Sequence, residues 1–156
     1  MTDLKQQQTI LSDYFEQHLP HIANSGLRLD AISEDRLRMS IALSDSSNEM
    51  GQAFGTSIYT LCHMACWSSL YLQCLEHIDK PTILSRDAQI RFRHPVTSER
   101  VIADCRLPNA TQWKGFFAHY RNTGKTSITL TSRIYCDERI DVYYDGVFVL
   151  LGESAE

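Results

Sequence analysis

One block of the sequence, from Met50 to Leu75, contains no Asp, Glu, Lys or Arg. Read as a helix from about Gly55 to Ile78, it carries apolar residues on nearly every side. Such a helix is either the buried centre of a domain or a membrane span, and this block is long enough to span. Polar residues inside it make a poor span and favour a buried helix: Thr60, His63, Ser68, Ser69 and Gln73.

Before this block, the apolar positions first recur at helical spacing and then alternate. Residues 4–19 have the pattern of an amphipathic helix, which Pro20 ends. Segments 27–31 and 37–43 alternate apolar and polar side chains, as half-buried strands do. Residues 44–48 are rich in Ser, Asp and Asn, and predict a loop that leads into the long helix.

After Lys80-Pro81 the alternation returns and predicts several strands. We expect strands at 88–92, 101–107 and 126–136, and an aromatic-rich strand at 113–121 that ends in a hairpin turn at 122–124. From Ile140 to Leu150 the side chains alternate with a period of two residues, and this alternation continues unbroken through Asp145-Gly146. A hairpin at Asp145-Gly146 would not have to preserve this alternation, whereas a single strand would. We therefore expect one strand with a glycine bulge, and a turn at Asp137-Glu138.

These elements predict an α+β fold of one domain, residues 1–156, with its core at about 20–151. Short turns between neighbouring strands favour an antiparallel sheet. A curved sheet around one long central helix, with an extra N-terminal helix, buries both elements at once. That is the hot-dog fold.

The net charge, the N-terminal residues and the cysteines limit the possible partners, compartment and metals of the protein. The formal net charge of −4 disfavours a nucleic-acid partner. Residues 1–8 are polar and show no secretory leader, so we expect a cytoplasmic protein. Three of the five cysteines (Cys62, Cys66 and Cys74) lie in the long helix, as reduced and packed thiols do. Cys62, His63 and Cys66 are a weak metal pattern, and we expect neither a metal nor a cofactor.

Three short motifs resemble bacterial thioesterases of the hot-dog fold. The first is Asn48-x-x-Gly51-x-x-Phe54-Gly55-x-Ser57, which would open the long helix, and the others are 90–96 and 146–149. The branch they most resemble also occurs as the C-terminal half of acetyltransferase fusions. The resemblance implies an acyl-thioester hydrolase that acts on acyl-coenzyme A or an acyl-carrier protein, as a homodimer or a dimer of dimers.

The sequence departs from that family at two helix-opening positions and at a third further along. Thr56 stands where a second glycine is usual, and Gln52 where threonine is common. The wider hot-dog thioesterases often carry Asp or Glu nine residues after Phe54, where this chain has His63. The missing carboxylate favours an alternative, a non-hydrolytic acyl-thioester binding or regulatory module. A dehydratase or hydratase is a third alternative, but its usual His/Asp arrangement is not evident.

The start of the long helix is the candidate catalytic site. Free amides at Gly55 and Thr56 would polarise a thioester carbonyl, and Asn48 would hold that carbonyl or a water. Alternatively, Gly55 is needed only for a tight turn into the helix, and Asn48 is an ordinary turn or capping residue. His63 is the one residue inside the helix whose pKa suits base catalysis, although a lone buried histidine is more often structural. Asp87 is a second candidate base, with a solvated carboxylate as its alternative.

Substrate binding is assigned to two groups of residues. Phe54, Ser57 and Thr60 accompany the helix start, and Thr60 shares a stripe with Thr56 and His63. Arg91 and Arg93 point away from Ile90 and Phe92 and would bind phosphates of coenzyme A or a pantetheine arm. A plain solvated strand face explains the two arginines equally well.

Overall fold

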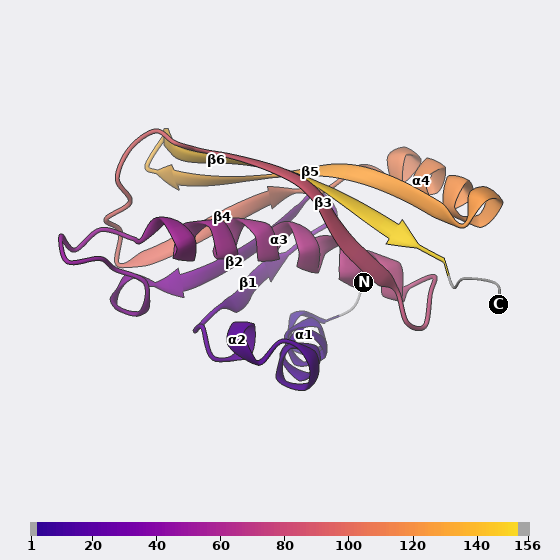
Figure 1. Cartoon of the computed structure of the whole chain (residues 1–156), viewed down its shortest axis with the longest axis horizontal. Coiled ribbons are helices and arrows are strands. Elements are labelled where there is room, and N and C mark those ends of the chain that lie inside the picture. The colour runs from indigo at the N-terminus through magenta and orange to yellow at the C-terminus, as the bar shows by residue number, and fades with distance from the viewer. Residues whose placement is uncertain (1–2, 153–156) are drawn as a thin grey trace.

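A six-stranded antiparallel sheet curves around one long helix in the computed structural model, which describes residues 3–152 (Figure 1). The central helix, α3, is Gly55–Leu75. The strands are β1 (Arg28–Ile32), β2 (Arg36–Ala42), β3 (Thr82–Phe92), β4 (Arg100–Arg106), β5 (Lys125–Cys136) and β6 (Arg139–Leu151). Their order across the sheet is β1-β2-β4-β5-β6-β3. The expected α+β hot-dog fold is therefore confirmed.

The central helix is buried on most sides. Thirteen of its 21 residues are buried, and the sheet covers one side of it (Figure 1). On the other side, Tyr14 and Phe15 of α1 (Leu4–His18) contact Trp67, with ring centroids 5.2 and 6.2 Å apart. Pro20 ends α1 as expected, but it also begins a short helix, α2 (Pro20–Ala23). No helix within residues 3–152 is both long and apolar enough to cross a bilayer.

The segment 113–121 is helical, and the expectation of a strand there was wrong. Helix α4 (Ala110–Thr123) begins at a capping box, in which the Asn109 side chain accepts from the Gln112 amide and the Gln112 side chain accepts from the Asn109 amide. Its buried aromatic residues, Trp113, Phe116 and Phe117, repeat at helical spacing. The expected hairpin turn at 122–124 is instead the helix end, where Gly124 adopts φ 74°.

The last strand is continuous, as expected, and the turn before it lies at Asp137-Glu138. The expected bulge at Gly146 was wrong, since Gly146 pairs regularly with Ala88 and Leu130. A side chain there has no room: an ideal Cβ on Gly146 would lie 2.7 Å from the Tyr144 hydroxyl and 2.9 Å from the Phe148 ring. Bulges lie instead at three unpaired residues, which are Asp30 in β1, Arg86 in β3 and Asp141 in β6.

Replacing Gly146 by alanine is therefore expected to destabilise the protein by about 1–3 kcal/mol, the usual cost of overpacking a filled core. Gly115→Ala is the matched control, because a Cβ on Gly115 meets no atom within 4 Å and alanine favours a helix. Denaturant unfolding of both variants measures the difference. Equal stability of the two would contradict the packing described for Tyr144 and Phe148.

Strand β3 begins six residues earlier than the predicted segment 88–92 and crosses over to pair with β6 at the edge of the sheet. The expected meander is thus confined to β4, β5 and β6. Asp87 accordingly lies in the middle of β3, directly after its bulge, and not at the start of the strand.

Candidate functional site

The first turn of α3 presents free backbone amides. Phe54 occupies the N-cap position and its side chain makes no capping hydrogen bond. The Ile58 amide donates to the Phe54 carbonyl, whereas within residues 3–152 the amides of Gly55, Thr56 and Ser57 have no acceptor. The Phe92 ring lies 3.6 Å from where a Cβ on Gly55 would be. This end of the helix can therefore receive a partial negative charge.

Asn48 shapes the loop that leads into α3. Its Oδ1 accepts from the amides of Met50 and Gln52, at 2.9 and 3.1 Å. The backbone of Asn48 bonds Gln52 as well, at 2.7 Å. These contacts make Asn48 a turn-forming residue and leave its amide nitrogen for another acceptor.

His63 lies at the centre of a polar chain between α3, β3 and β6. Its Nδ1 is 2.6 Å from the hydroxyl of Tyr144, and its Nε2 is 3.0 Å from the hydroxyl of Ser85. The Tyr59 ring stacks on the imidazole, with centroids 5.6 Å apart, and the Phe148 ring packs against it at 5.2 Å. Both the position and the orientation of the imidazole are therefore fixed.

Burial sets the protonation states of His63 and Tyr144. It lowers the pKa of His63, so the imidazole is neutral at neutral pH. Burial also raises the pKa of Tyr144, and a hydrogen bond with Tyr59 acts in the same direction, so the phenol keeps its proton. A neutral histidine with one acceptor nitrogen can take a proton from a hydroxyl or from water.

The other residues expected around His63 are dispersed. Thr56, Ser57 and Thr60 line a hollow of about 510 Å³ between α3, α2 and the turn at Gly26. Thr60 donates to the Thr56 carbonyl at 2.9 Å. The stripe expected for Thr56, Thr60 and His63 is thus divided, with the threonines facing α2 and His63 facing β3 and β6.

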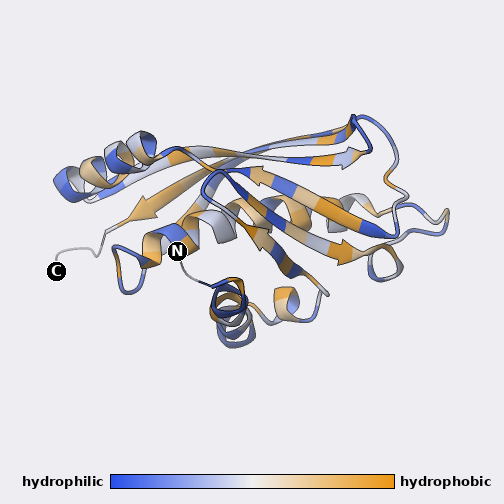
Figure 2. Ribbon diagram, turned by 180° about the vertical axis from the view of Figure 1, so that it is seen from behind, coloured by the Kyte–Doolittle hydropathy of each residue, from blue (hydrophilic) through white to orange (hydrophobic). Residues whose placement is uncertain are grey.

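Asp87, Arg91 and Arg93 lie on the side of the sheet away from His63. Asp87 pairs with Val147 and Arg91 with Tyr143, on the outer face of β6, and the Asp87 carboxylate accepts from the Ala88 amide at 2.8 Å. The Arg93 guanidinium lies 5.9 Å from the Tyr143 ring centroid. Figure 2 shows the sheet from behind, where hydrophilic and hydrophobic residues alternate along the strands that face the viewer.

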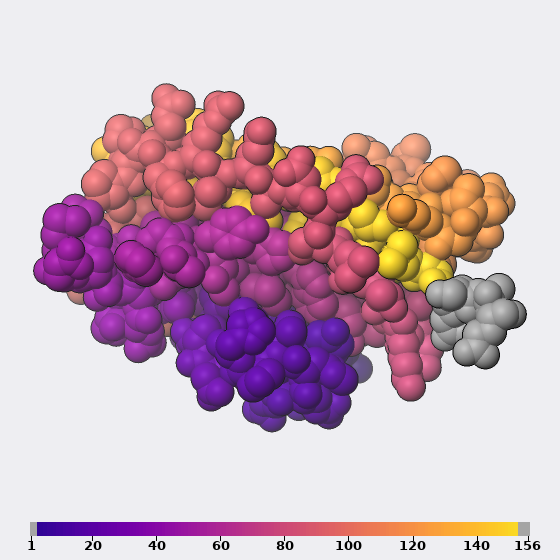
Figure 3. Space-filling model, in the orientation of Figure 1, coloured from indigo at the N-terminus to yellow at the C-terminus, as the bar shows by residue number. Residues whose placement is uncertain are grey.

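Exposed apolar side chains gather where α3 begins beside β3. The large exposed ones include Met50, Phe54, Tyr59 and Phe92, and Phe54 and Phe92 are each more than half exposed. Figure 3 shows these two segments, magenta and pink, on one face of the molecule. Strand β3 pairs with β6 along one edge, and within residues 3–152 no strand pairs with its other edge. An apolar patch beside a free edge is typical of an interface.

The buried thiols stand apart from this chemistry. Cys62, Cys66, Cys74 and Cys105 are buried and free, and burial raises the pKa of Cys74 to about 12 and that of Cys62 still further. Cys66 lies 3.7 Å from Cys105 and donates to the Ser132 hydroxyl at 3.4 Å.

A thiol reagent is expected to label Cys136 first, because it alone among the five is partly exposed. The four buried thiols should react only on unfolding, because the reagent cannot reach them in the folded protein. Counting labelled thiols in native and denatured protein checks this. Fast native labelling of Cys62 with loss of activity would instead indicate a nucleophilic cysteine.

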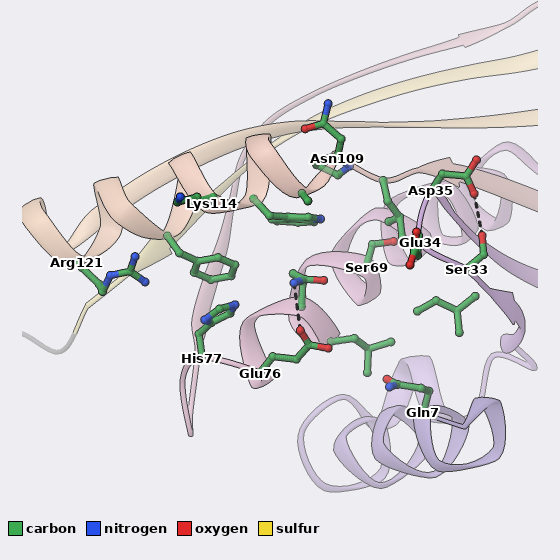
Figure 4. Close-up of a pocket in the computed structure, with 18 residues that line it drawn as sticks. Gln7, Ser33, Glu34, Asp35, Ser69, Glu76, His77, Asn109, Lys114 and Arg121 are labelled. Carbon is green, nitrogen blue, oxygen red and sulfur yellow. Dashed lines mark hydrogen bonds between the residues drawn. The ribbon is translucent and has the colours of Figure 1, made fainter. Parts of the chain in front are cut away.

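A cavity of about 710 Å³ lies at the opposite end of α3 (Figure 4). Trp113 and Phe117 of α4, Leu72 of α3 and Leu107 line its apolar part. Lys114 and Arg121 of α4 lie toward one side of it, and Glu34 and Asp35 of the β1–β2 turn toward the other. Neither His63 nor the start of α3 lines this cavity, so it is separate from the candidate catalytic residues.

The fold is the hot-dog fold of a thioesterase family. The chain belongs to the family described as "Putative thioesterase (yiiD_Cterm)", whose model matches residues 8–152. No curated protein matches the chain.

Solved structures agree on the fold. A Chlorobaculum tepidum protein of unknown function is 27% identical, with a TM-score of 0.89 over 96% of this chain and 97% of that one. A structure from Shewanella oneidensis, titled a putative thioesterase, is 22% identical, with a TM-score of 0.78 over 94% and 99%. Thioesterase HI1161 from Haemophilus influenzae is 13% identical, with a TM-score of 0.68 over 100% and 95%.

Proposed function

We propose that the chain hydrolyses acyl thioesters of coenzyme A or of an acyl-carrier protein, without a cofactor and in the cytoplasm. The observation that carries the proposal is the setting of His63 in a chain of a thioesterase family. Its imidazole is neutral, and each of its two ring nitrogens makes a hydrogen bond. His63 would accept the proton of the attacking oxygen, the role that a helix carboxylate often has in related proteins.

The proposed site needs two copies of the chain. Gly55 and His63 are eight residues apart on α3, which is about 12 Å along a helix. One thioester carbonyl cannot touch both the amides of the first turn and His63 of the same copy. The free edge of β3 and its exposed apolar residues support a homodimer, or a dimer of dimers, in which one copy supplies the amides and the other His63.

The remaining residues would bind and position the substrate. In this proposal the carbonyl oxygen accepts from the amides of Gly55 and Thr56, and Phe54, Ser57 and Thr60 contact the thioester beside them. Arg91 and Arg93, exposed toward the end of β3, would bind the phosphates of the carrier. Asp87 faces away from His63, so we do not assign it the role of base.

Asn48→Ala is expected to lower kcat by about one to three powers of ten, with a smaller change in KM. Its Oδ1 holds the loop that sets the first turn of α3, so its loss would misplace the amides that stabilise the transition state. Steady-state thiol release measures both constants. A change in KM alone would assign Asn48 to uniform substrate binding.

The proposed function is tested by the release of free thiol from acetyl-, hexanoyl-, decanoyl- and benzoyl-coenzyme A and from acylated carrier protein. Turnover of at least one of them supports hydrolysis. The alternative, a binding or regulatory module, is favoured by the absence of a helix carboxylate and by the separate apolar cavity beside α4. Tight binding of an acyl thioester without turnover would select that alternative.

A further inference from the structure

Ser85 contacts Nε2 of His63, the imidazole nitrogen on the side away from Tyr144, and is its one hydrogen-bond partner within residues 3–152. The bulge at Arg86 sets its direction, because one unpaired residue lets Ser85 point toward α3 while Asp87 points to the outer face. Ser85 pairs with Phe148, whose side chain also faces α3. Ser85 is exposed and lies on the strand with the free edge, so a substrate held between two copies can reach it.

The hydrogen bonds of His63 can run in one of two directions. If Tyr144 donates to Nδ1, then Nε2 carries the proton and Ser85 is only an acceptor. In the other direction Nδ1 carries the proton and donates to the Tyr144 hydroxyl, which is both a donor and an acceptor. Tyr144 then accepts from Nδ1–H, and Nε2 is left to accept from Ser85.

We infer that Ser85 is the nucleophile of the proposed thioesterase, activated by His63, which Tyr144 holds in the required tautomer. This inference rests on the proposed function, since it names the attacking oxygen of that reaction. The arrangement follows the logic of a nucleophile, a base and an orienting third group. Tyr144 is a positioning residue, because it acts through His63.

The reaction balances in two steps. In the first, Ser85 Oγ bonds to the carbonyl carbon while its proton passes to His63 Nε2. The carbon–sulfur bond then breaks, and the thiol leaves with that proton. In the second, water attacks the Ser85 ester and gives its proton to His63, the carbon–Oγ bond breaks, and Ser85 recovers the proton as the carboxylic acid departs.

The test compares wild type with Ser85→Ala, and with Ser127→Ala, an exposed serine on the outer face of β5, as the matched control. Turnover is measured with whichever acyl-coenzyme A the wild type cleaves fastest. Acid-quenched protein is then examined by mass spectrometry and peptide mapping for an acyl group on Ser85. A fluorophosphonate probe, which labels nucleophilic serines without any thioester, tests Ser85 independently of turnover.

We expect Ser85→Ala to lose at least 10²-fold in kcat with unchanged unfolding, Ser127→Ala to match wild type, and the probe or the acyl group to map to Ser85. Retention of more than a tenth of the turnover by Ser85→Ala would overturn the inference. So would a loss of turnover with no adduct on Ser85, which leaves water as the nucleophile. Labelling of Ser85 by the probe in a protein that cleaves no thioester would overturn the proposed function and leave the activated serine intact.

Discussion

His63→Ala is expected to lower kcat by about 10²–10⁴-fold, the usual contribution of a positioned general base. The substitution also leaves the buried Tyr144 hydroxyl without its partner, which costs about 1–3 kcal/mol of stability. Turnover must therefore be expressed per folded molecule. His119→Ala, an exposed histidine on α4, is the control and should behave as wild type.

The pH dependence of kcat and of stability provides a second test of the role of His63. Because burial lowers its pKa below the ordinary 6.5, the base stays neutral to below that value. We expect kcat to be flat above it and to fall as the pH drops through the lowered pKa. Stability should decline as the pH falls from about 6.5 to the lowered pKa, since over that range the unfolded chain takes up a proton that folded His63 resists. A variant with unchanged turnover and reduced stability would make His63 purely structural.

Phe92→Asp is expected to abolish both dimerisation and activity. Phe92 is 53% exposed and lies against Gly55, where the apolar patch meets the free edge of β3. Burying a carboxylate in that interface is costly, and a separated copy has His63 but no amides opposite it. The expected loss in kcat is at least about 10²-fold, as for the removal of an oxyanion donor.

Light scattering and turnover on the same sample test this variant. Ile102→Asp is the matched control, because Ile102 is an exposed apolar residue of β4, in the interior of the sheet. It should remain dimeric and active. A wild type that is monomeric at micromolar concentration, or a fully active monomeric Phe92→Asp, would refute the shared site.

Local patterns in the sequence predicted most of the fold. The charge-free block from Met50 to Leu75 has apolar side chains on nearly every side. Burying them requires other elements around the helix, and this predicts the central helix. The unbroken period from Ile140 to Leu150 likewise gave β6 as one strand. Helix α4 was missed because aromatic content was weighed above spacing. Trp113, Phe116 and Phe117 already stand at i, i+3 and i+4, between a capping Asn109 and Gly124.

The site was less accessible to sequence reasoning. His63 was found because it is the one residue inside the apolar block whose ordinary pKa suits base catalysis at neutral pH, and the free amides follow from the helix start. Ser85 and Tyr144 lie 22 and 81 residues from His63, and only tertiary contacts bring them to it. The bulge at Arg86, which turns Ser85 inward and Asp87 outward, depends on pairing with β6 and leaves no local pattern.

The central claim is that a thioester is cleaved between His63 of one copy and the first turn of α3 of another. The most direct measurement is thiol release by a purified mixed dimer, co-expressed with two different tags, of His63→Ala and Gly55→Pro. Proline is tolerated at the first helical position and removes one amide donor. Each homodimer should be nearly inactive, whereas the mixed dimer retains one intact site of two and should show about half of the wild-type turnover. A mixed dimer as inactive as its parents would contradict the claim.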